Sequence, residues 1–177
     1  DVTGGNNVCI GFRAGESATS IDSCVGIGKG AYDGANTGDN NIAIGRDSIG
    51  NAATTGGGNI CIGVEAGKSI TAGEYNVAIG YQALDASDDA GSNTAVGAFA
   101  LGALDSNVSG NVAVGMKAGM NLDADHSTFI GWKCGEDASS GYHNTGVGSQ
   151  ALLNVTTGYS STAVVYQALK SMDDGVE

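Results

Sequence analysis

A five-residue phrase recurs ten times along the chain at a nearly constant interval, with NVAIG and NIAIG as typical copies. The copies begin at Asn7, Cys24, Asn41, Asn59, Asn76, Asn93, Asn111, Ser127, Asn144 and Ser161. Successive copies start 16 to 18 residues apart. A period this short and regular indicates a stack of small, similar units rather than a globular domain around one irregular core.

The phrase itself alternates in side-chain character. We number its residues as columns one to five and continue the numbering past it. Column four is Ile or Val in every copy, and column two is Val, Ile or Thr. Columns one, three and five hold Asn or small residues, except for Phe129 and for Val165 in the degraded last copy. A period of two is typical of a β-strand, so each repeat is predicted to form a short strand with a branched face and a small-residue face.

No Asp, Glu, Lys or Arg occurs in any of the ten phrases. A strand with one face in water normally carries some charge on that face, so both faces are predicted to be covered. We expect the other wall of the same coil to cover one face and a neighbouring copy of the chain to cover the second. The side chains expected at the core of this assembly, which the resemblance described below implies to be a homotrimer, are Val8, Ile42, Ile60, Val77 and Val112.

The remainder of each repeat supplies turns and a second wall. Column eight is Ala, Ser or Cys and is followed mostly by Gly or Leu, which predicts a second, shorter strand or extended segment. The loops between are rich in Gly, Asn, Asp, Ser and Thr and carry most of the acidic residues. The predicted fold is therefore all-β, a parallel β-roll (β-solenoid) of about ten 17-residue coils. It forms a single repeat domain over residues 1–177, expected to be a segment of a longer fibrous protein because neither end carries an obvious cap.

A triangular β-helix of the hexapeptide acyltransferase type has coils of similar length but needs an aliphatic residue at every sixth position. Stepping by six from Ile10 meets Glu16 and Asp22, and stepping from Ile62 meets Lys68 and Glu74. The sequence therefore disfavours that fold and the acyltransferase function that goes with it.

Composition excludes several classes of partner. The net charge of −12 argues against nucleic acid, since binding to phosphates requires a basic surface. No window approaches 18 consecutive apolar residues, so no membrane-spanning segment is expected. Three of the four cysteines, Cys9, Cys61 and Cys134, take columns otherwise filled by small residues, and no C-x-x-C spacing occurs. Free thiols that act as small buried side chains are therefore expected.

The fuller phrases NVAIGYQAL at Asn76 and NTGVGSQAL at Asn144 resemble the head repeats of trimeric autotransporter (YadA-like) adhesins. Longer loops containing TTG, at Thr54 and Thr156, are similar to repeats of phage tail fibres. The resemblance covers about residues 6 to 170 and implies a left-handed, homotrimeric roll. The repeat is longer than the usual adhesin repeat, and no neck or anchor segment is present in the sequence, which favours a fibre or filament segment.

Catalytic signals are weak, and no enzyme activity is expected. Asp125, His126 and Ser127 are adjacent in sequence and so cannot converge as a hydrolytic triad. The glycines of GIGKG at Gly26 do not lie between a strand and a helix, so they form no nucleotide loop.

Metal binding has two weak candidates. His126 and His143 precede consecutive phrases, which their period alone explains; a metal site formed with Asp125 is the alternative. No cofactor is expected, except for an isolated calcium ion at the acidic loops. These loops contain Asp85, Asp88 and Asp89 in one repeat and Asp123 and Asp125 in another.

Recognition of a partner is expected on columns six and seven, where rings and polar groups recur. The candidate receptor contacts are Tyr81, Trp132, Tyr166 and Lys133. The predicted function is that of a non-enzymatic structural and recognition segment of a phage tail fibre or surface adhesin. It would bind a cell-surface glycan or protein, on the virion, outside the cell or on a cell surface. The alternatives are a subunit of an extracellular filament, a lectin-like or enzymatic solenoid, and an ice-binding protein, for which the column of Thr is too irregular.

Overall fold

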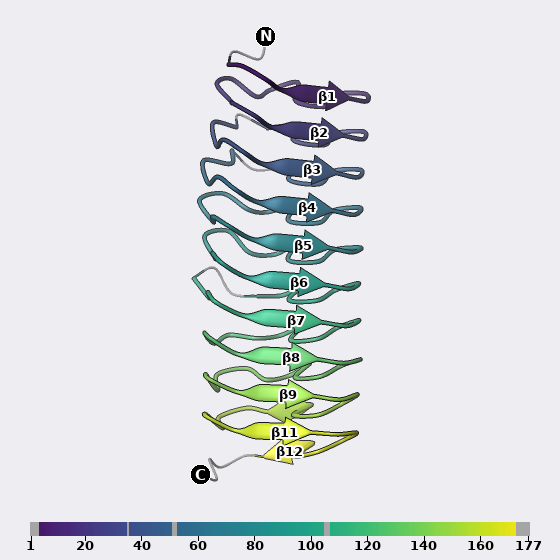
Figure 1. Cartoon of the computed structure of the whole chain (residues 1–177), viewed down its shortest axis with the longest axis vertical. Coiled ribbons are helices and arrows are strands. Elements are labelled where there is room, and N and C mark those ends of the chain that lie inside the picture. Colours follow the sequence, from purple (N-terminus) through teal and green to yellow (C-terminus); the bar gives the residue numbers. More distant parts are fainter. Residues whose placement is uncertain (1–3, 35, 51–52, 105–106, 173–177) are drawn as a thin grey trace.

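The computed structural model describes residues 4–34, 36–50, 53–104 and 107–172. Figure 1 shows one continuous rod in which the strands lie one above another in chain order. Ten of them form a single parallel sheet, one strand for each copy of the phrase. These strands are β1 (Val8–Ile10), β2 (Val25–Ile27), β3 (Ile42–Ile44), β4 (Ile60–Ile62), β5 (Val77–Ile79), β6 (Thr94–Val96), β7 (Val112–Val114), β8 (Thr128–Ile130), β9 (Thr145–Val147) and β11 (Thr162–Val164).

The register of the sheet matches the columns of the sequence. Strand β5 pairs with β6 so that Ala78 lies opposite Ala95, and every other pair aligns equivalent columns in the same way. From β2 onward the middle residue of each of these strands is buried, while the first and third are partly or largely exposed. The predicted parallel β-solenoid is confirmed, and from β2 onward the column-three residue of each strand is the one that lies inside the coil.

The predicted second strand at column eight is wrong. Residues of columns six to nine form consecutive turns instead. In the described residues, the strands outside the main sheet are β10 (Asn154–Val155) and β12 (Ser171–Met172), which lie further along the repeat, in columns eleven and twelve; Ser20 forms an isolated bridge. The reason is that columns seven and nine both adopt positive φ, as Gln82 (49°) and Leu84 (52°) illustrate, and two left-handed residues so close together cannot lie in a strand.

Four columns of every coil have positive φ: five, seven, nine and column zero, the residue before the phrase. Column five is the most demanding, because its nine glycines have φ between 131° and 142°, a region that residues with a Cβ rarely adopt. A Cβ on Gly97 would lie 2.6 Å from the carbonyl carbon of Gly115 in the next coil. Glycine is required there by both the backbone conformation and the stacking distance.

Column one forms a continuous ladder of side-chain hydrogen bonds inside the rod. The Oδ1 atom of Asn76 accepts the backbone N–H of Asn93 at 2.9 Å, and its Nδ2 donates to the carbonyl of Ala90 at 2.7 Å. The backbone N–H of column one is bound in the same way at all nine steps from coil to coil. Cys24 and Ser127 replace Asn in this column and still accept the bond, through Sγ and Oγ.

The interior is filled by compensation between columns three and nine. Where column three is Ala, as in Ala78, column nine of the same coil is often a large residue such as Leu84, and both are buried. Where column three is Phe129, column nine is Gly135, and a Cβ there would lie 2.5 Å from the ring. In the coil of β7 both columns are small, and a Cβ on Gly119 would lie 2.9 Å from Leu101 and 3.2 Å from the ring of Phe129, so the large side chains of the adjacent coils fill that space.

We expect Asn93→Ala to destabilise the rod by about 2 to 4 kcal/mol, because the substitution leaves the buried N–H of Asn111 and the carbonyl of Val108 without partners. The measurement is the shift of the urea unfolding transition. Asn93→Ser is the matched comparison, since Ser127 shows that a hydroxyl can act as the acceptor in this column. Equal stability of the alanine variant and the wild type would contradict the ladder's role.

Candidate functional site

The first candidate surface is the outer face of the ten-stranded sheet, formed by columns two and four. The five side chains expected at a trimer core lie here: Val8 is 44% exposed, and Ile42, Ile60, Val77 and Val112 are half-buried. Column four is similarly open, with Ile79, Val114 and Ile130 between 36% and 40% exposed. The chain by itself therefore leaves an apolar, uncharged and regularly ridged face in contact with solvent.

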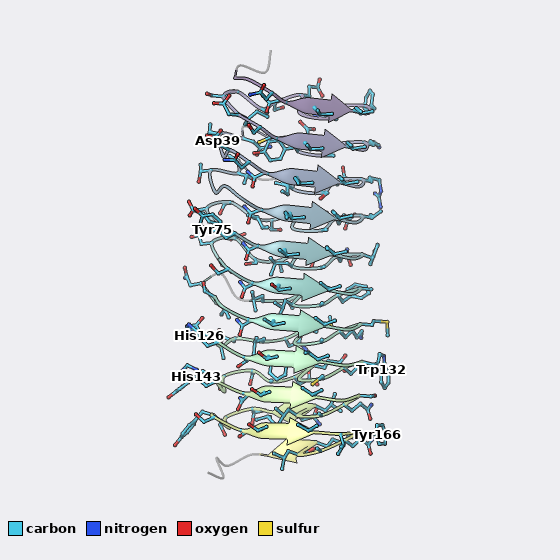
Figure 2. The ribbon with its side chains drawn as sticks, in the orientation of Figure 1. Asp39, Tyr75, His126, Trp132, His143 and Tyr166 are labelled. Atoms are coloured by element: carbon cyan, nitrogen blue, oxygen red, sulfur yellow. The ribbon has the colours of Figure 1, made fainter. Side chains whose placement is uncertain are left out.

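The second surface is the edge that follows the ends of the strands. Figure 2 shows Trp132 and Tyr166 projecting from this edge, beyond the arrowheads. Tyr81 occupies the same column, three coils before Trp132, and the three rings are 43% to 66% exposed. The structure thus places the predicted aromatic contacts on one edge but does not bring them together. Each coil adds about 4.8 Å along the rod, and two or three coils separate one ring from the next.

Lys133 is more constrained than the rings. Its Nζ lies 2.8 Å from Oε2 of Glu136 and 5.3 Å from the centroid of the Trp132 ring. Glu136 also pairs with Lys117 of the preceding coil at 3.3 Å. Lys133 therefore has a structural role on this edge, and its charge is already partly neutralised before any ligand arrives.

Column seven carries polar contacts that run from coil to coil. Gln82 donates to Glu65 at 2.7 Å, and Gln167 donates to Gln150 at 2.7 Å. The hydrogen bond from Gln82 lowers the pKa of Glu65, as do the nearby charges of Lys68 and Arg46. These residues hold adjacent turns in register. The sequence predicted only that columns six and seven are exposed and did not reveal these contacts between coils.

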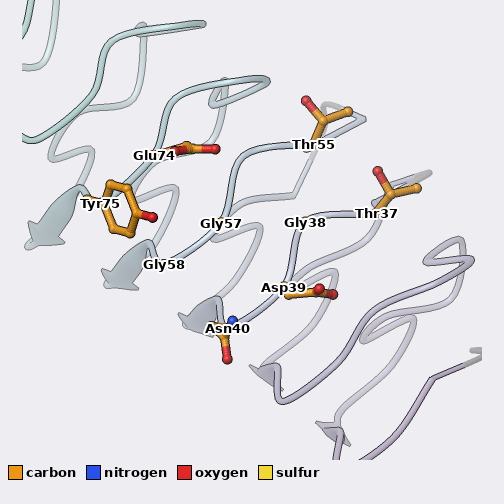
Figure 3. Close-up of a pocket in the computed structure, with 9 residues that line it drawn as sticks. All are labelled: Thr37, Gly38, Asp39, Asn40, Thr55, Gly57, Gly58, Glu74 and Tyr75. Atoms are coloured by element: carbon orange, nitrogen blue, oxygen red, sulfur yellow. The ribbon is translucent and has the colours of Figure 1, made fainter.

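The opposite edge, where the loops enter the strands, is polar and partly acidic. Figure 3 shows a shallow hollow across neighbouring coils, lined by Thr37, Gly38, Asp39, Asn40, Thr55, Gly57, Gly58, Glu74 and Tyr75. Asp39 is already engaged, since its Oδ1 accepts the backbone N–H of Asp22 at 2.8 Å. Asp125 accepts the N–H of Ser109 at 2.7 Å in the equivalent way further along the rod. Asp39 and Asp125 both stand two residues before the phrase, and each links its loop to the loop of the preceding coil by a hydrogen bond.

His126 and His143 lie on this loop edge in consecutive coils (Figure 2), with ring centroids 5.4 Å apart. The sequence predicted this proximity from the period. In the part of the chain that the structure describes, no group of three His, Cys, Asp or Glu side chains is arranged to hold a metal ion. The three-residue set of Asp125, His126 and His143 is therefore not formed as a site.

Among the residues that the structure describes, the carboxylates of the acidic loops are not grouped in a set of three or more that could hold a calcium ion either. Asp89 accepts a hydrogen bond from the hydroxyl of Thr71 at 2.8 Å, and the backbone carbonyl of Asp88 accepts from the same residue. Burial raises the pKa of Asp85, which disfavours its charged form. Asp123 and Asp125 line a separate hollow with His126, Ser140 and His143.

The cysteines are all free, as expected, but their burial differs. Cys24, Cys61 and Cys134 are buried, and burial raises the pKa of Cys61 to about 12 and that of Cys134 to about 11. The prediction that Cys9 is buried is wrong, because β1 has a neighbouring strand on one side only. With pKa values of about 12 and about 11, the buried thiols of Cys61 and Cys134 are protonated at neutral pH and are poor nucleophiles.

No family model, curated protein or solved structure matches this chain. Within the described ranges, no helix is long and apolar enough to cross a membrane.

We expect a thiol reagent to modify Cys9 rapidly in the native protein and to reach the other three cysteines only after unfolding. Labelling should accelerate as the pH rises, because the thiolate is the reacting form and the pKa of Cys9 lies above its usual value. Mass spectrometry of the labelled protein provides the count, and Cys9→Ser should abolish the rapid phase. Rapid native labelling of Cys61 would contradict the packing described above.

Proposed function

We propose that this chain is a rigid, non-enzymatic rod that self-associates through its sheet face and serves as a structural and recognition segment of a phage tail fibre or surface adhesin. The observation that carries the proposal is the uncharged sheet face, which the chain leaves half-exposed from one end of the main sheet to the other. The attachment function and the location, on a virion or outside a cell, rest on the resemblance of the phrase to adhesin and tail-fibre repeats.

The number of side chains on the face and the spacing of its ridges are compatible with another copy of the chain as its partner. Ten strands with two outward residues each present twenty side chains, all of them Val, Ile or Thr. Stable interfaces contain about 20 to 30 residues on each side. The ridges of the face repeat once per coil, about every 4.8 Å, and a second rod of the same kind carries ridges with the same spacing. Since this spacing is common to stacked parallel strands, the choice of a second copy of this chain rests on the uncharged face, which no charged group of the phrase interrupts, and on the resemblance.

Three copies are proposed because the resemblance implies a trimer, in which all three sheet faces meet around one axis. Val8, Ile42, Ile60, Val77 and Val112 would then lie in the shared core. The two edges, with their variable loops and exposed rings, would remain outside, where recognition of a glycan or protein is usually found. A subunit of an extracellular filament is the second candidate, since the same face would also serve lateral packing of rods.

We expect the wild-type protein to be trimeric in solution and Val77→Asp or Val112→Asp to be monomeric. An unpaired charge buried in an apolar interface costs several kcal/mol, whereas on a single rod the same side chain points outward and is tolerated. The mass of the particle, measured by light scattering after gel filtration, and the circular dichroism spectrum report assembly and folding separately.

The matched control is Ser92→Asp, which introduces the same charge at an exposed position one residue before the phrase and off the sheet face. This variant should assemble like the wild type. A wild-type protein that remains monomeric at high concentration would overturn the proposed self-association, as would full assembly of the folded Val77→Asp variant.

The recognition half of the proposal is tested with a triple variant, Tyr81→Ala with Trp132→Ala and Tyr166→Ala. Binding to a glycan array or to intact cells should fall tenfold or more if these rings contact the receptor, because aromatic anchors dominate most interfaces. Assembly should be unchanged, since the rings lie on the edge of the rod.

A matched control removes three exposed tyrosines from the opposite edge, at Tyr75, Tyr142 and Tyr159. Loss of binding only in the first variant would support the predicted contacts. Unchanged binding in the first variant would make this edge a passive part of the shaft.

A further inference from the structure

The only two histidines of the chain stand side by side on the loop edge of the rod. His126 and His143 both occupy column zero, in consecutive coils, and both are exposed. Their ring centroids are 5.4 Å apart and their planes are inclined by 33°. Neither ring packs in the core, so both rings are accessible to a ligand from solvent.

The backbone conformation of column zero accommodates histidine, which is among the residues enriched at positive φ, so it does not by itself argue for or against a binding role. All ten of its residues have positive φ, including His126 at 57° and His143 at 60°. Asn and Gly, which adopt this conformation most readily, occupy four of the ten positions. Gly110 precedes His126 in the column, and a Cβ there would approach the His126 ring at 3.2 Å, so the glycine leaves room for that ring.

The separation of the rings fits a shared metal ion. A divalent metal ion bound 2.0 to 2.1 Å from an imidazole nitrogen lies about 3.2 Å from the ring centroid, so two rings 5.4 Å apart subtend about 115° at the ion. That angle is close to tetrahedral. Binding requires each ring to turn one nitrogen toward the common point, and both side chains are exposed.

We propose that His126 and His143 chelate a divalent transition metal ion of the imidazole-preferring class, such as Zn²⁺, Ni²⁺ or Cu²⁺. The other positions on the ion are filled by water, because no third His, Cys, Asp or Glu side chain completes the set among the described residues. The site goes beyond the proposed attachment function and does not depend on self-association, since column zero lies off the sheet face.

The surroundings favour a cation. The hollow beside the two rings is lined by Asp123, Asp125 and Ser140 together with Tyr142, and no Lys or Arg is among its described lining residues. Asp125 uses Oδ1 to accept the N–H of Ser109, which leaves its second oxygen available to a metal-bound water. Tyr142 packs edge-on against His143 at 5.3 Å and limits the orientations of that ring.

The test is calorimetric titration of the purified chain with ZnCl₂ and, separately, NiCl₂. We expect one ion per chain, with affinity at least tenfold lower in His126→Ala and in His143→Ala. Addition of millimolar Ca²⁺ should leave Zn²⁺ binding unchanged, because calcium prefers oxygen ligands. Circular dichroism of each variant confirms that the rod remains folded.

A displaced pair provides the sharpest control. Ser160 follows His143 in column zero of the next coil, with φ of 54° and an exposed side chain. Adding Ser160→His to His126→Ala rebuilds a pair one coil further along and should restore binding. Adding Ser92→His instead places the new ring three coils from His143, out of reach, and should not restore it.

Binding that survives removal of either histidine would overturn the proposal and assign the ion to the acidic loops. Failure of Ser160→His to restore binding, in a folded protein, would also contradict a chelate set by coil spacing. Absence of Zn²⁺ and Ni²⁺ binding to the wild-type chain would reject the site outright.

Discussion

The rod depends on the buried hydrogen-bond ladder of column one. Each asparagine, or the Cys or Ser that replaces it, accepts the backbone N–H of its equivalent in the next coil. In a dry interior these bonds cannot be replaced by water, so a coil that slipped in register would leave several polar groups unpaired. Apolar side chains alone would not impose this penalty, because one small aliphatic residue fits against another in many registers.

Close stacking imposes the second constraint. The glycines of column five lie so near those of adjacent coils that a Cβ would meet a backbone carbonyl, and residues with a Cβ rarely adopt their φ values. At the last strand of the main sheet this constraint is relaxed: Val165, the column-five residue that follows β11, has a Cβ and a φ of 99°. The phrase is repetitive because each of its inward positions meets a copy of itself above and below.

The outward positions are free of these demands and divide the rod into surfaces with different chemistry. The sheet face is apolar and uncharged, the strand-end edge carries rings and ion pairs such as Lys133 with Glu136, and the loop edge carries carboxylates and the histidine pair. In a solenoid, equivalent positions of successive coils form a stripe along the rod. Because each coil contacts only its neighbours, a substitution in one coil changes one position of the stripe and leaves the other coils unchanged. This separation allows self-association, recognition and metal binding to be tested independently by substitutions on different columns.

The period and alternation of the phrase were enough to predict the parallel solenoid, its strand positions and the proximity of His126 and His143. They were enough because strand spacing converts equal sequence intervals into adjacency. A second wall was predicted, but its conformation as consecutive turns was not, since Leu84 and Leu101 adopt left-handed conformations that local preference disfavours and that their burial in the core stabilises. Only the folded coil showed that Phe129 is accommodated by Gly135, that Cys9 is exposed, and that Lys133 is held by Glu136. Each of these depends on which side chains meet across a turn or between coils, and the repeat pattern gives the columns without giving their contacts.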